Sequence, residues 1–229
     1  MSGDNGLVAL RQDLTMIDWP INPQKTALIN VDLQNIFVDG FVDSSVGSKV
    51  VQRLNKLSKV CRSAGIIVIH TAQETRTDGA NRGIADQIIR SYMDSYRKSV
   101  RAVNDGGITS GSKSAELSPL LDIHPDDIIL VKPRYGAFTG TDLDLILRSN
   151  SIDAVIIGGI ATNICCETTA REANMRDYKV FFLSDGTANH GLEDLSPGDV
   201  KKATLATLRF AFAQILSVDE VIEKIKASA

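Results

Sequence analysis

Short apolar runs alternate with amphipathic stretches along most of this 229-residue chain. The runs richest in β-branched residues are 27–31, 66–70, 128–131, 154–157 and 180–183, with a weaker candidate at 214–216. They are apolar on both faces, as parallel strands are when helices cover both sides of their sheet. Strands that alternate with helices at this spacing indicate βαβ units. The pattern predicts an α/β fold in which a parallel sheet lies between two helical layers.

The stretches between the runs favour helices. The clearest, 46–64, carries Val50, Leu54, Leu57 and Cys61 at helical spacing, with basic residues on its other side. The remaining predicted helices are 142–149, 163–176, 197–212 and 219–227.

Two segments do not fit the alternation. Residues 74–111 are irregular, with a helical core around 85–97, and we expect them to cross the sheet edge or the active site. The first 24 residues are polar and contain Pro20 and Pro23, so we expect an arm that lies on the body or on a neighbouring subunit. Residues 25–229 are then a single domain, which suits a chain of this length.

The composition excludes several classes of protein. A net charge of -3 provides no general positive field for nucleic acid or an anionic membrane. No apolar run approaches the roughly 20 residues that span a bilayer. The three cysteines, two of them adjacent, do not resemble a disulfide framework, and the first 24 residues do not resemble a secretory signal. We therefore expect a cytoplasmic protein with neither a nucleic-acid nor a membrane partner.

The segment 158–166 carries the most chemical information. Paired glycines end an apolar run, and Cys165 follows where a helix is expected to begin. Unpaired N–H groups and the helix dipole favour a thiolate at such a place, and the thiolate is the nucleophilic form. The alternative is a small buried thiol in the core. This segment alone does not separate the two interpretations.

Charged residues follow two other predicted strands. Asp32 ends the first run and Lys132 ends the third, and ligands of parallel sheets bind outside the carboxyl ends of the strands. Taken singly, Asp32 suits a helix cap and Lys132 a surface position. As an ion pair at the sheet edge they would keep each other charged. With Cys165 as nucleophile and Asp32 as base, they form a candidate catalytic set.

A cysteine–histidine pair is the alternative, because His70 and His190 both follow predicted strands. Spacing alone does not rank it below Asp32 and Lys132. A metal site is not expected, since the three histidines have no close partners at ligand spacing. No glycine-rich phosphate loop follows a strand, so no cofactor is expected.

Three blocks match a known family. They are residues 27–35, with Asp32; residues 132–138, with Lys132; and residues 159–165, with Cys165. In this order and at these separations, over roughly residues 25–215, the chain resembles the isochorismatase-like cysteine hydrolases. These include nicotinamidases, N-carbamoylsarcosine amidohydrolases and ureidoacrylate amidohydrolases.

The resemblance implies roles and a fold. Cys165 matches the nucleophile, Asp32 the general base and Lys132 its basic partner. The Ile160–Ala161 bond matches a cis peptide, and the N–H groups of Ala161 and Cys165 match an oxyanion hole. The implied fold is a three-layer α/β/α sandwich around a six-stranded parallel sheet, and family members commonly form homo-oligomers, dimers or tetramers.

The branches of the family differ in chemistry. Nicotinamidases carry an Asp-x-His metal motif after the first strand and helix, together with another histidine, and we expect no such motif and no metal-dependent nicotinamide hydrolysis here. Isochorismatases of siderophore synthesis lack the nucleophilic cysteine, so Cys165 argues against that branch. The sequence therefore favours a metal-independent amidohydrolase acting on a small amide, ureide or N-carbamoyl compound. The alternatives are a nicotinamidase-type or isochorismatase-type hydrolase and a non-catalytic binding protein of the same fold.

Five residues near the strand ends are candidates for binding the substrate. They are Gln34, Phe37, Gln73, Tyr135 and Phe138. The alternative for each is ordinary loop or core packing.

Overall fold

A computed structural model of the protein describes residues 17–96 and 107–228. All six of its strands lie in one parallel sheet of order β3-β2-β1-β4-β5-β6. The strands are β1 (Thr26–Val31), β2 (Ile67–Gln73), β3 (Ile128–Lys132), β4 (Ala154–Ile160), β5 (Lys179–Ala188) and β6 (Gln214–Leu216). The strand order reverses between β1 and β4, and such a switch point is where parallel sheets bind ligands.

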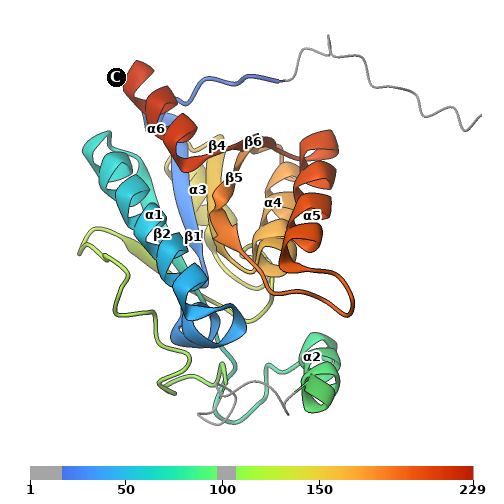
Figure 1. Ribbon diagram of the computed structural model, residues 1–229. Helices are drawn as coiled ribbons and strands as arrows, with labels where there is room; N and C mark the ends of the chain where they lie inside the picture. The colour runs from blue at the N-terminus through green and yellow to red at the C-terminus, as the bar shows by residue number, and fades with distance from the viewer. Residues whose placement is uncertain (1–16, 97–106, 229) are drawn as a thin grey trace, which may run out of the picture.

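Helices cover both faces of the sheet. They are α1 (Ser44–Ser63), α2 (Ile84–Tyr96), α3 (Leu143–Ser149), α4 (Glu167–Asn174), α5 (Pro197–Ala211) and α6 (Val218–Ala227). Helices α1 and α6 pack on one face, and α3, α4 and α5 on the other (Figure 1). The predicted three-layer α/β/α fold with a six-stranded parallel sheet is confirmed.

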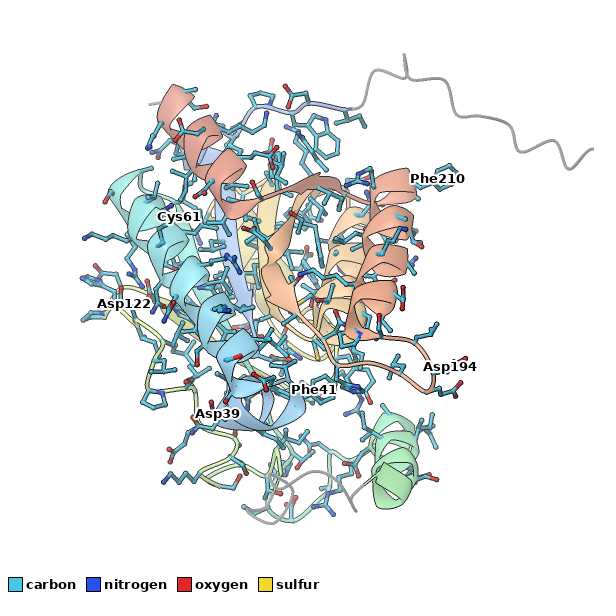
Figure 2. All side chains as sticks on the ribbon, in the orientation of Figure 1. Asp39, Phe41, Cys61, Asp122, Asp194 and Phe210 are labelled. Atoms are coloured by element: carbon cyan, nitrogen blue, oxygen red, sulfur yellow. The ribbon has the colours of Figure 1, made fainter. Side chains whose placement is uncertain are left out.

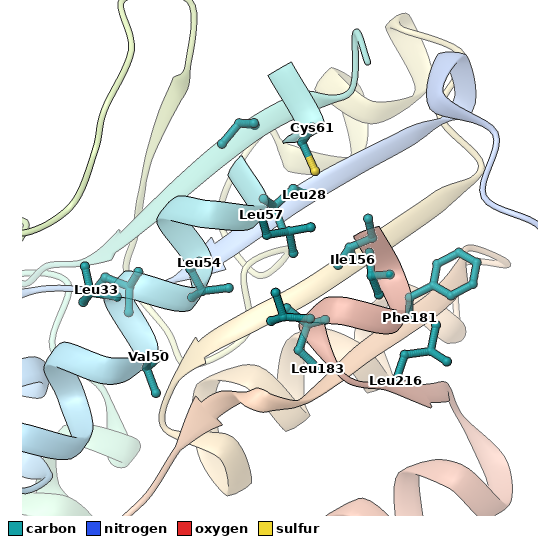
Figure 3. Close-up of a cluster of buried hydrophobic side chains, with 14 of the residues drawn as sticks. Leu28, Leu33, Val50, Leu54, Leu57, Cys61, Ile156, Phe181, Leu183 and Leu216 are labelled. Atoms are coloured by element: carbon teal, nitrogen blue, oxygen red, sulfur yellow. The ribbon is translucent and has the colours of Figure 1, made fainter. Parts of the chain in front are cut away.

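Each face of the sheet has its own hydrophobic core. Beneath α1, the predicted stripe of Val50, Leu54, Leu57 and Cys61 is buried and points at the sheet (Figure 3). Burying one such side chain stabilises the fold by about 1.5–3 kcal/mol. Cys61 is therefore a core residue, and burial raises the pKa of its thiol to about 12.

The edge strand β3 departs from the sequence prediction of two apolar, covered faces. Ile129 and Val131 are 47% and 53% exposed, whereas Leu130 and Lys132 on the other face are buried. The prediction was wrong here because β3 ends the sheet and α1 packs over the inner strands (Figure 1).

The helix predicted at 163–176 is also different. Its first turn is a π-helix, η4 (Thr162–Cys166), and the α-helix proper is α4, which ends at Asn174. The predicted helical core at 85–97 is α2, which lies apart from the layers in Figure 1. Position 97 lies outside the described residues.

The described part of the N-terminal segment, 17–24, packs on this chain's own body. The backbone N–H of Trp19 donates to the side-chain oxygen of Gln214 at 3.0 Å. The rings of Trp19 and Phe181 pack edge-on, with their centroids 6.2 Å apart. Ile21 is fully buried in the core. Residues 1–16 of the predicted arm lie outside the described residues.

The paired glycines of β4 allow the sheet to close tightly at the switch point. Gly159 has φ +135°, a conformation that side chains rarely adopt, and a Cβ there would lie 2.0 Å from the carbonyl oxygen of Val31. The register of β4 against β5 shifts at the same place. Strand β4 thus runs two glycines and Ile160 past the predicted end at 157 and brings the next segment close to the end of β1.

None of the helices in the described part of the chain combines the length and the apolar character that crossing a membrane requires.

Candidate active site

Asp32 lies immediately beyond β1 and is completely buried. Its φ of +52° turns the chain sharply, a conformation that aspartate adopts more readily than most residues. Thr71 at the neighbouring β2 holds it: the Asp32 N–H donates to Thr71 Oγ1 at 3.1 Å, and that hydroxyl donates to Asp32 Oδ1 at 2.6 Å. The carboxylate is thereby fixed with Oδ2 left for other contacts.

Lys132 is the last residue of β3 and is also completely buried. Its Nζ lies 2.7 Å from Asp32 Oδ2 and donates to the carbonyl oxygens of Arg134 and Tyr135 at 2.8 and 2.9 Å. The ammonium group is thus surrounded by three oxygen atoms, one from its ion-pair partner and two from backbone carbonyls. Burial by itself lowers the pKa of Lys132, but the negative charges of Asp32 and of ionised Cys165 together raise this pKa above its ordinary value. The structure thus excludes the surface-lysine interpretation.

The nucleophile candidate Cys165 lies in the π-helical turn after β4 and is 3% exposed. Its thiol donates to Gln73 Oε1 at 3.6 Å, and both Lys132 and Asp32 act electrostatically on it. The ends of β1, β2, β3 and β4 therefore meet at one place, where a thiol, a carboxylate and an ammonium group come together.

Burial raises the pKa of the Cys165 thiol well above its usual range. The Lys132 ammonium and the backbone N–H of Ala161 act to lower this pKa, whereas the Asp32 carboxylate raises it further. Desolvation of the buried sulfur thus opposes the thiolate that the sequence argument expects at a helix end. Burial therefore favours the protonated sulfur, and a base beside it would assist its action as a nucleophile.

The peptide bond between Ile160 and Ala161 is cis, as the family resemblance implied. Ala161 is buried, and its N–H is directed at the Cys165 sulfur. The Ala161 carbonyl accepts the N–H of Cys166 at 3.1 Å. Ala161 therefore points a backbone donor at the sulfur.

Neither histidine of the alternative pair contacts Cys165. His70 is fully buried on the α1 face of the sheet, where its ring lies 3.0 Å from Asp127 Oδ2 and 3.3 Å from the amide of Asn30. The ring of His190 packs edge-on against Phe41 at 4.2 Å, and its Nδ1 contacts the Gly191 carbonyl. The structure favours the set of Asp32, Lys132 and Cys165.

The five candidate substrate-binding residues are placed differently. Gln73 touches the sulfur, and Tyr135 lies close enough for ionised Cys165 to raise the pKa of its phenol, although burial contributes more. The side-chain amide of Gln34 is fully buried; it donates to the carbonyl of Gln73 and accepts the N–H of Gln73. It therefore fixes the backbone of Gln73. Phe37 packs against the core under α1. Phe138 is buried, and its ring packs against that of Tyr178.

The sequence argument missed the roles of Thr71, Thr169 and Glu172. Thr71 was seen only as a strand-end residue, and nothing in its spacing marks it as the partner of Asp32. Glu172 lies in the predicted helix 163–176 and received no role there. It is half-buried and bonds to the segment that follows Lys132.

Metal ligands do not gather at the site. In the residues that the structure describes, no group of three or more His, Cys, Asp or Glu side chains could hold an ion. The chain does contain one Asp-x-His triplet, Asp122 to His124, which the sequence argument passed over. It lies before β3, where Asp122 pairs with Arg62 at 3.0 Å and His124 lies 3.3 Å from Asp126.

The comparison with family models matches residues 26–220 to the isochorismatase domain. The chain is 31% identical over 206 residues to ureidoacrylate amidohydrolase RutB of Caulobacter vibrioides, covering 86% of this chain and 89% of that protein. It is 32% identical over 178 residues to an isochorismatase of Bacillus subtilis, covering 77% of this chain and 52% of that protein. The chain thus spans about half the length of this second relative.

A solved structure agrees with the sequence relatives. The crystal structure of a cysteine hydrolase from Pseudomonas syringae pv. phaseolicola is 30% identical and superposes with a TM-score of 0.82. The match covers 93% of this chain and 98% of that one. With the domain match over most of its length, this chain belongs to the isochorismatase family.

Proposed function

We propose that this protein is a metal-independent cysteine amidohydrolase that cleaves a C–N bond of a small amide, ureide or N-carbamoyl compound. The observation that carries the proposal is the buried ion pair of Asp32 and Lys132 beside the Cys165 thiol. A buried pair of charges is costly to desolvate, and functional sites retain such groups. The similarity to a ureidoacrylate amidohydrolase supports a ureide-like substrate.

In the first step, Asp32 Oδ2 accepts the proton of Cys165. The sulfur attacks the substrate carbonyl carbon, an S–C bond forms, and the carbonyl electron pair moves to oxygen. The N–H groups of Ala161 and Cys165 stabilise that oxyanion. Oδ2 suits this role because, among the described residues, it has the Lys132 ion pair but no hydrogen bond in good geometry.

In the second step, the oxyanion collapses and the C–N bond breaks. Asp32 gives its proton to the departing nitrogen, which leaves a thioester on Cys165. Asp32 then takes a proton from water, the resulting hydroxide attacks the thioester, and the S–C bond breaks as the sulfur recovers its proton. Lys132 remains protonated throughout and stabilises the negative charge on Asp32 and on the sulfur.

The decisive experiment measures ammonia release from a panel of ureides, N-carbamoyl amino acids and primary amides. We expect turnover of at least one class, in the presence of a chelator. Cys165→Ser should abolish it while the melting temperature stays close to that of the wild type. Cys166→Ala, which alters the neighbouring thiol, is the matched control and should retain turnover.

Two results would contradict the proposal. Retained turnover in Cys165→Ser would end the covalent mechanism. A wild type that is inactive on the whole panel would favour the isochorismatase-type reaction or the non-catalytic binding protein. We further propose that the protein is a cytoplasmic homo-oligomer, a dimer or tetramer. Its molar mass in solution can be measured by light scattering. We propose a small-molecule substrate and neither a nucleic-acid nor a membrane partner.

A further inference from the structure

The segment that follows Lys132 determines where the ammonium group lies. Two of its three donors are held by backbone carbonyls of this segment, those of Arg134 and Tyr135. A main-chain shift of this segment would therefore move Nζ relative to Asp32 and the sulfur. What fixes the segment consequently bears on the chemistry proposed above.

Helix α4, which directly follows the cysteine turn, is bonded to this segment at two places. Thr169 accepts the N–H of Ala137 at 3.1 Å, and its hydroxyl donates to the carbonyl of Cys165 at 2.7 Å. One threonine thus links the main chain of the nucleophile to the main chain beyond Lys132. It is fully buried, so water does not compete for these bonds.

Glu172, one turn further along α4, makes the second connection. Its carboxylate accepts the N–H of Phe138 at 3.1 Å and also the hydroxyl of Thr139. A Cβ at Gly136 would lie 2.1 Å from Glu172 Oε2, so the carboxylate rests directly against the glycine backbone. The segment is glycine at this point because the carboxylate occupies the space of a side chain.

The surroundings of Glu172 hold it in that place. Arg176 donates to the Glu172 carbonyl at 2.9 Å, and its guanidinium lies 4.9 Å from the centre of the Phe138 ring. Glu172 lies in α4, and Arg176 follows the end of this helix. Their positions are explained by these contacts with the segment after Lys132, because both face that segment.

We infer that Glu172 is a positioning residue, which holds the 134–139 segment so that the Lys132 ammonium stays aligned with Asp32 and Cys165. The inference rests on the proposed function. It assigns Glu172 no contact with substrate, and its effect passes through the carbonyls that bind Lys132. Charge-assisted hydrogen bonds of this kind are among the stronger ones, and small displacements in a site cost much activity.

The test compares Glu172→Ala with Glu167→Ala. Glu167 is a matched control, since it lies on the same helix and nearer to Cys165 in sequence, but its carboxylate pairs with Arg171 at 2.7 Å. We expect kcat to fall about tenfold to a hundredfold in Glu172→Ala with KM changed less than about threefold, and both constants within about twofold of wild type in the control.

A second readout requires no substrate. The alkylation rate of Cys165 by iodoacetamide is followed against pH by mass spectrometry. Because the Lys132 ammonium lowers the pKa of this thiol, a displaced ammonium shifts the rising profile to higher pH, so that alkylation is slower at any one pH. We expect that shift in Glu172→Ala and not in Glu167→Ala. A purely structural role would lower the melting temperature and leave the profile of the folded protein unchanged.

Two further variants keep the inference falsifiable if Glu172→Ala folds poorly. Glu172→Gln retains an oxygen for the Phe138 N–H and should recover most of the activity. Gly136→Ala should push the carboxylate away and reproduce the kinetic defect. In the Glu172→Ala background the same glycine change should add little, because the group it displaces is already absent.

The outcomes separate the two proposals. Turnover with equal kinetics and pH profiles in Glu172→Ala and Glu167→Ala overturns the positioning role and leaves the proposed function standing. No turnover on the panel, together with the shifted alkylation profile, overturns the proposed function and supports the positioning role. A wild-type protein that shows no turnover and is not alkylated at Cys165 overturns both the proposed function and the positioning role.

Discussion

Two buried polar networks lie on opposite faces of the neighbouring strands β1 and β2. On the α1 face, Asn30 donates to Ser58 at 3.0 Å and contacts His70, whose ring meets Asp127 at 3.0 Å. At the carboxyl edge, one residue beyond His70, Thr71 holds Asp32. The two networks thus start from adjacent residues of one strand, since successive side chains point to opposite faces.

The networks differ in how their charges are satisfied. Arg62 binds both carboxylate oxygens of Asp127, at 3.0 and 2.6 Å, and Arg62 itself reaches solvent. In the catalytic network, Asp32 and Lys132 are both fully buried and their charges neutralise each other next to the Cys165 thiol, whose pKa burial raises. The first arrangement is built for stability. The second keeps a proton acceptor beside a proton donor, which is what a reaction requires.

The two networks also respond differently to burial. Burial lowers the pKa of His70, so its ring stays neutral although Asp127 acts in the opposite direction. Burial also acts to raise the pKa of Asp127, but the Arg62 guanidinium and the His124 N–H lower it to about 2. The charge of Asp127 is thus stabilised by several hydrogen bonds, whereas the charges of Asp32 and Lys132 are stabilised mainly by their ion pair.

The largest expected effect comes from breaking the catalytic pair. Lys132→Met leaves Asp32 as an unpaired buried charge and should cost about 3–5 kcal/mol of unfolding free energy. It should also lower kcat/KM by about 10²- to 10⁴-fold. Urea denaturation and steady-state kinetics measure the two effects. The double variant Asp32→Asn/Lys132→Met removes both charges, so it should regain stability but no activity. Equal urea midpoints for wild type and Lys132→Met would disprove the buried ion pair.

The next largest effect concerns the network of His70 and Asp127, and it is tested by measuring stability against pH. The folded-state pKa of Asp127, about 2, lies below its ordinary 3.8, so its stabilisation is complete above pH 3.8 and is lost as the pH falls toward 2. The pKa of His70 is lowered from 6.5, so stability already begins to fall below that pH.

Asp127→Asn should therefore cost about 2 kcal/mol at neutral pH and remove the acid step below pH 4. Its kcat should stay near that of wild type, because the residue lies away from the sulfur. Thermal melts between pH 2 and 8 measure this. A loss of kcat as large as that of Lys132→Met would show that the two networks are one.

A smaller effect should come from the residue that holds Asp32. Thr71→Val keeps the shape of the side chain and removes the hydroxyl that donates to Asp32 Oδ1. We expect kcat to fall about tenfold as the base loses its alignment, with the folded structure retained. The comparison with Asp127→Asn is direct, since one variant should lose mainly activity and the other mainly stability. An unchanged kcat in Thr71→Val would contradict the role assigned to this hydroxyl.

The smallest effect belongs to ion pairs outside both networks. On α6, Glu223 and Lys226 pair at 2.9 Å with side chains that are 72% and 62% exposed. Glu223→Ala should change the free energy of unfolding by less than about 0.5 kcal/mol and leave activity unchanged, because water screens such pairs. A cost above about 1 kcal/mol would mean that exposed pairs also support this fold. Phe210, which is 91% exposed on α5 (Figure 2), is a comparable surface position for an apolar side chain.

Much of the fold was readable from the sequence because buried strands carry a local signal. The run at 214–216 became β6 with the same bounds, and the stripe of Val50, Leu54 and Leu57 became the buried face of α1. The exposed face of β3 was not readable, because a run such as Ile128–Lys132 is apolar whether its strand is central or at an edge. Strand order is decided by pairing between distant segments.

The sequence predicted which residue types form the candidate site. It did not predict their local backbone structure or their pKa values. Asp32, Lys132 and Cys165 stand at strand ends, and parallel strands bring those ends to one edge. The sequence predicted an ordinary helix from residue 163, and the π-helical turn at Thr162–Cys166 was not predicted.

The sequence by itself determined the α/β alternation, the chemical groups available and the strand ends that carry them. Only the tertiary structure decided that burial raises the pKa of the Cys165 thiol, that Thr71 holds the base and that Glu172 contacts the segment after Lys132. The physical reason is that hydrophobic periodicity acts over a few residues. Desolvation and hydrogen-bond partners depend on segments that lie tens of residues apart and meet only when the sheet is assembled.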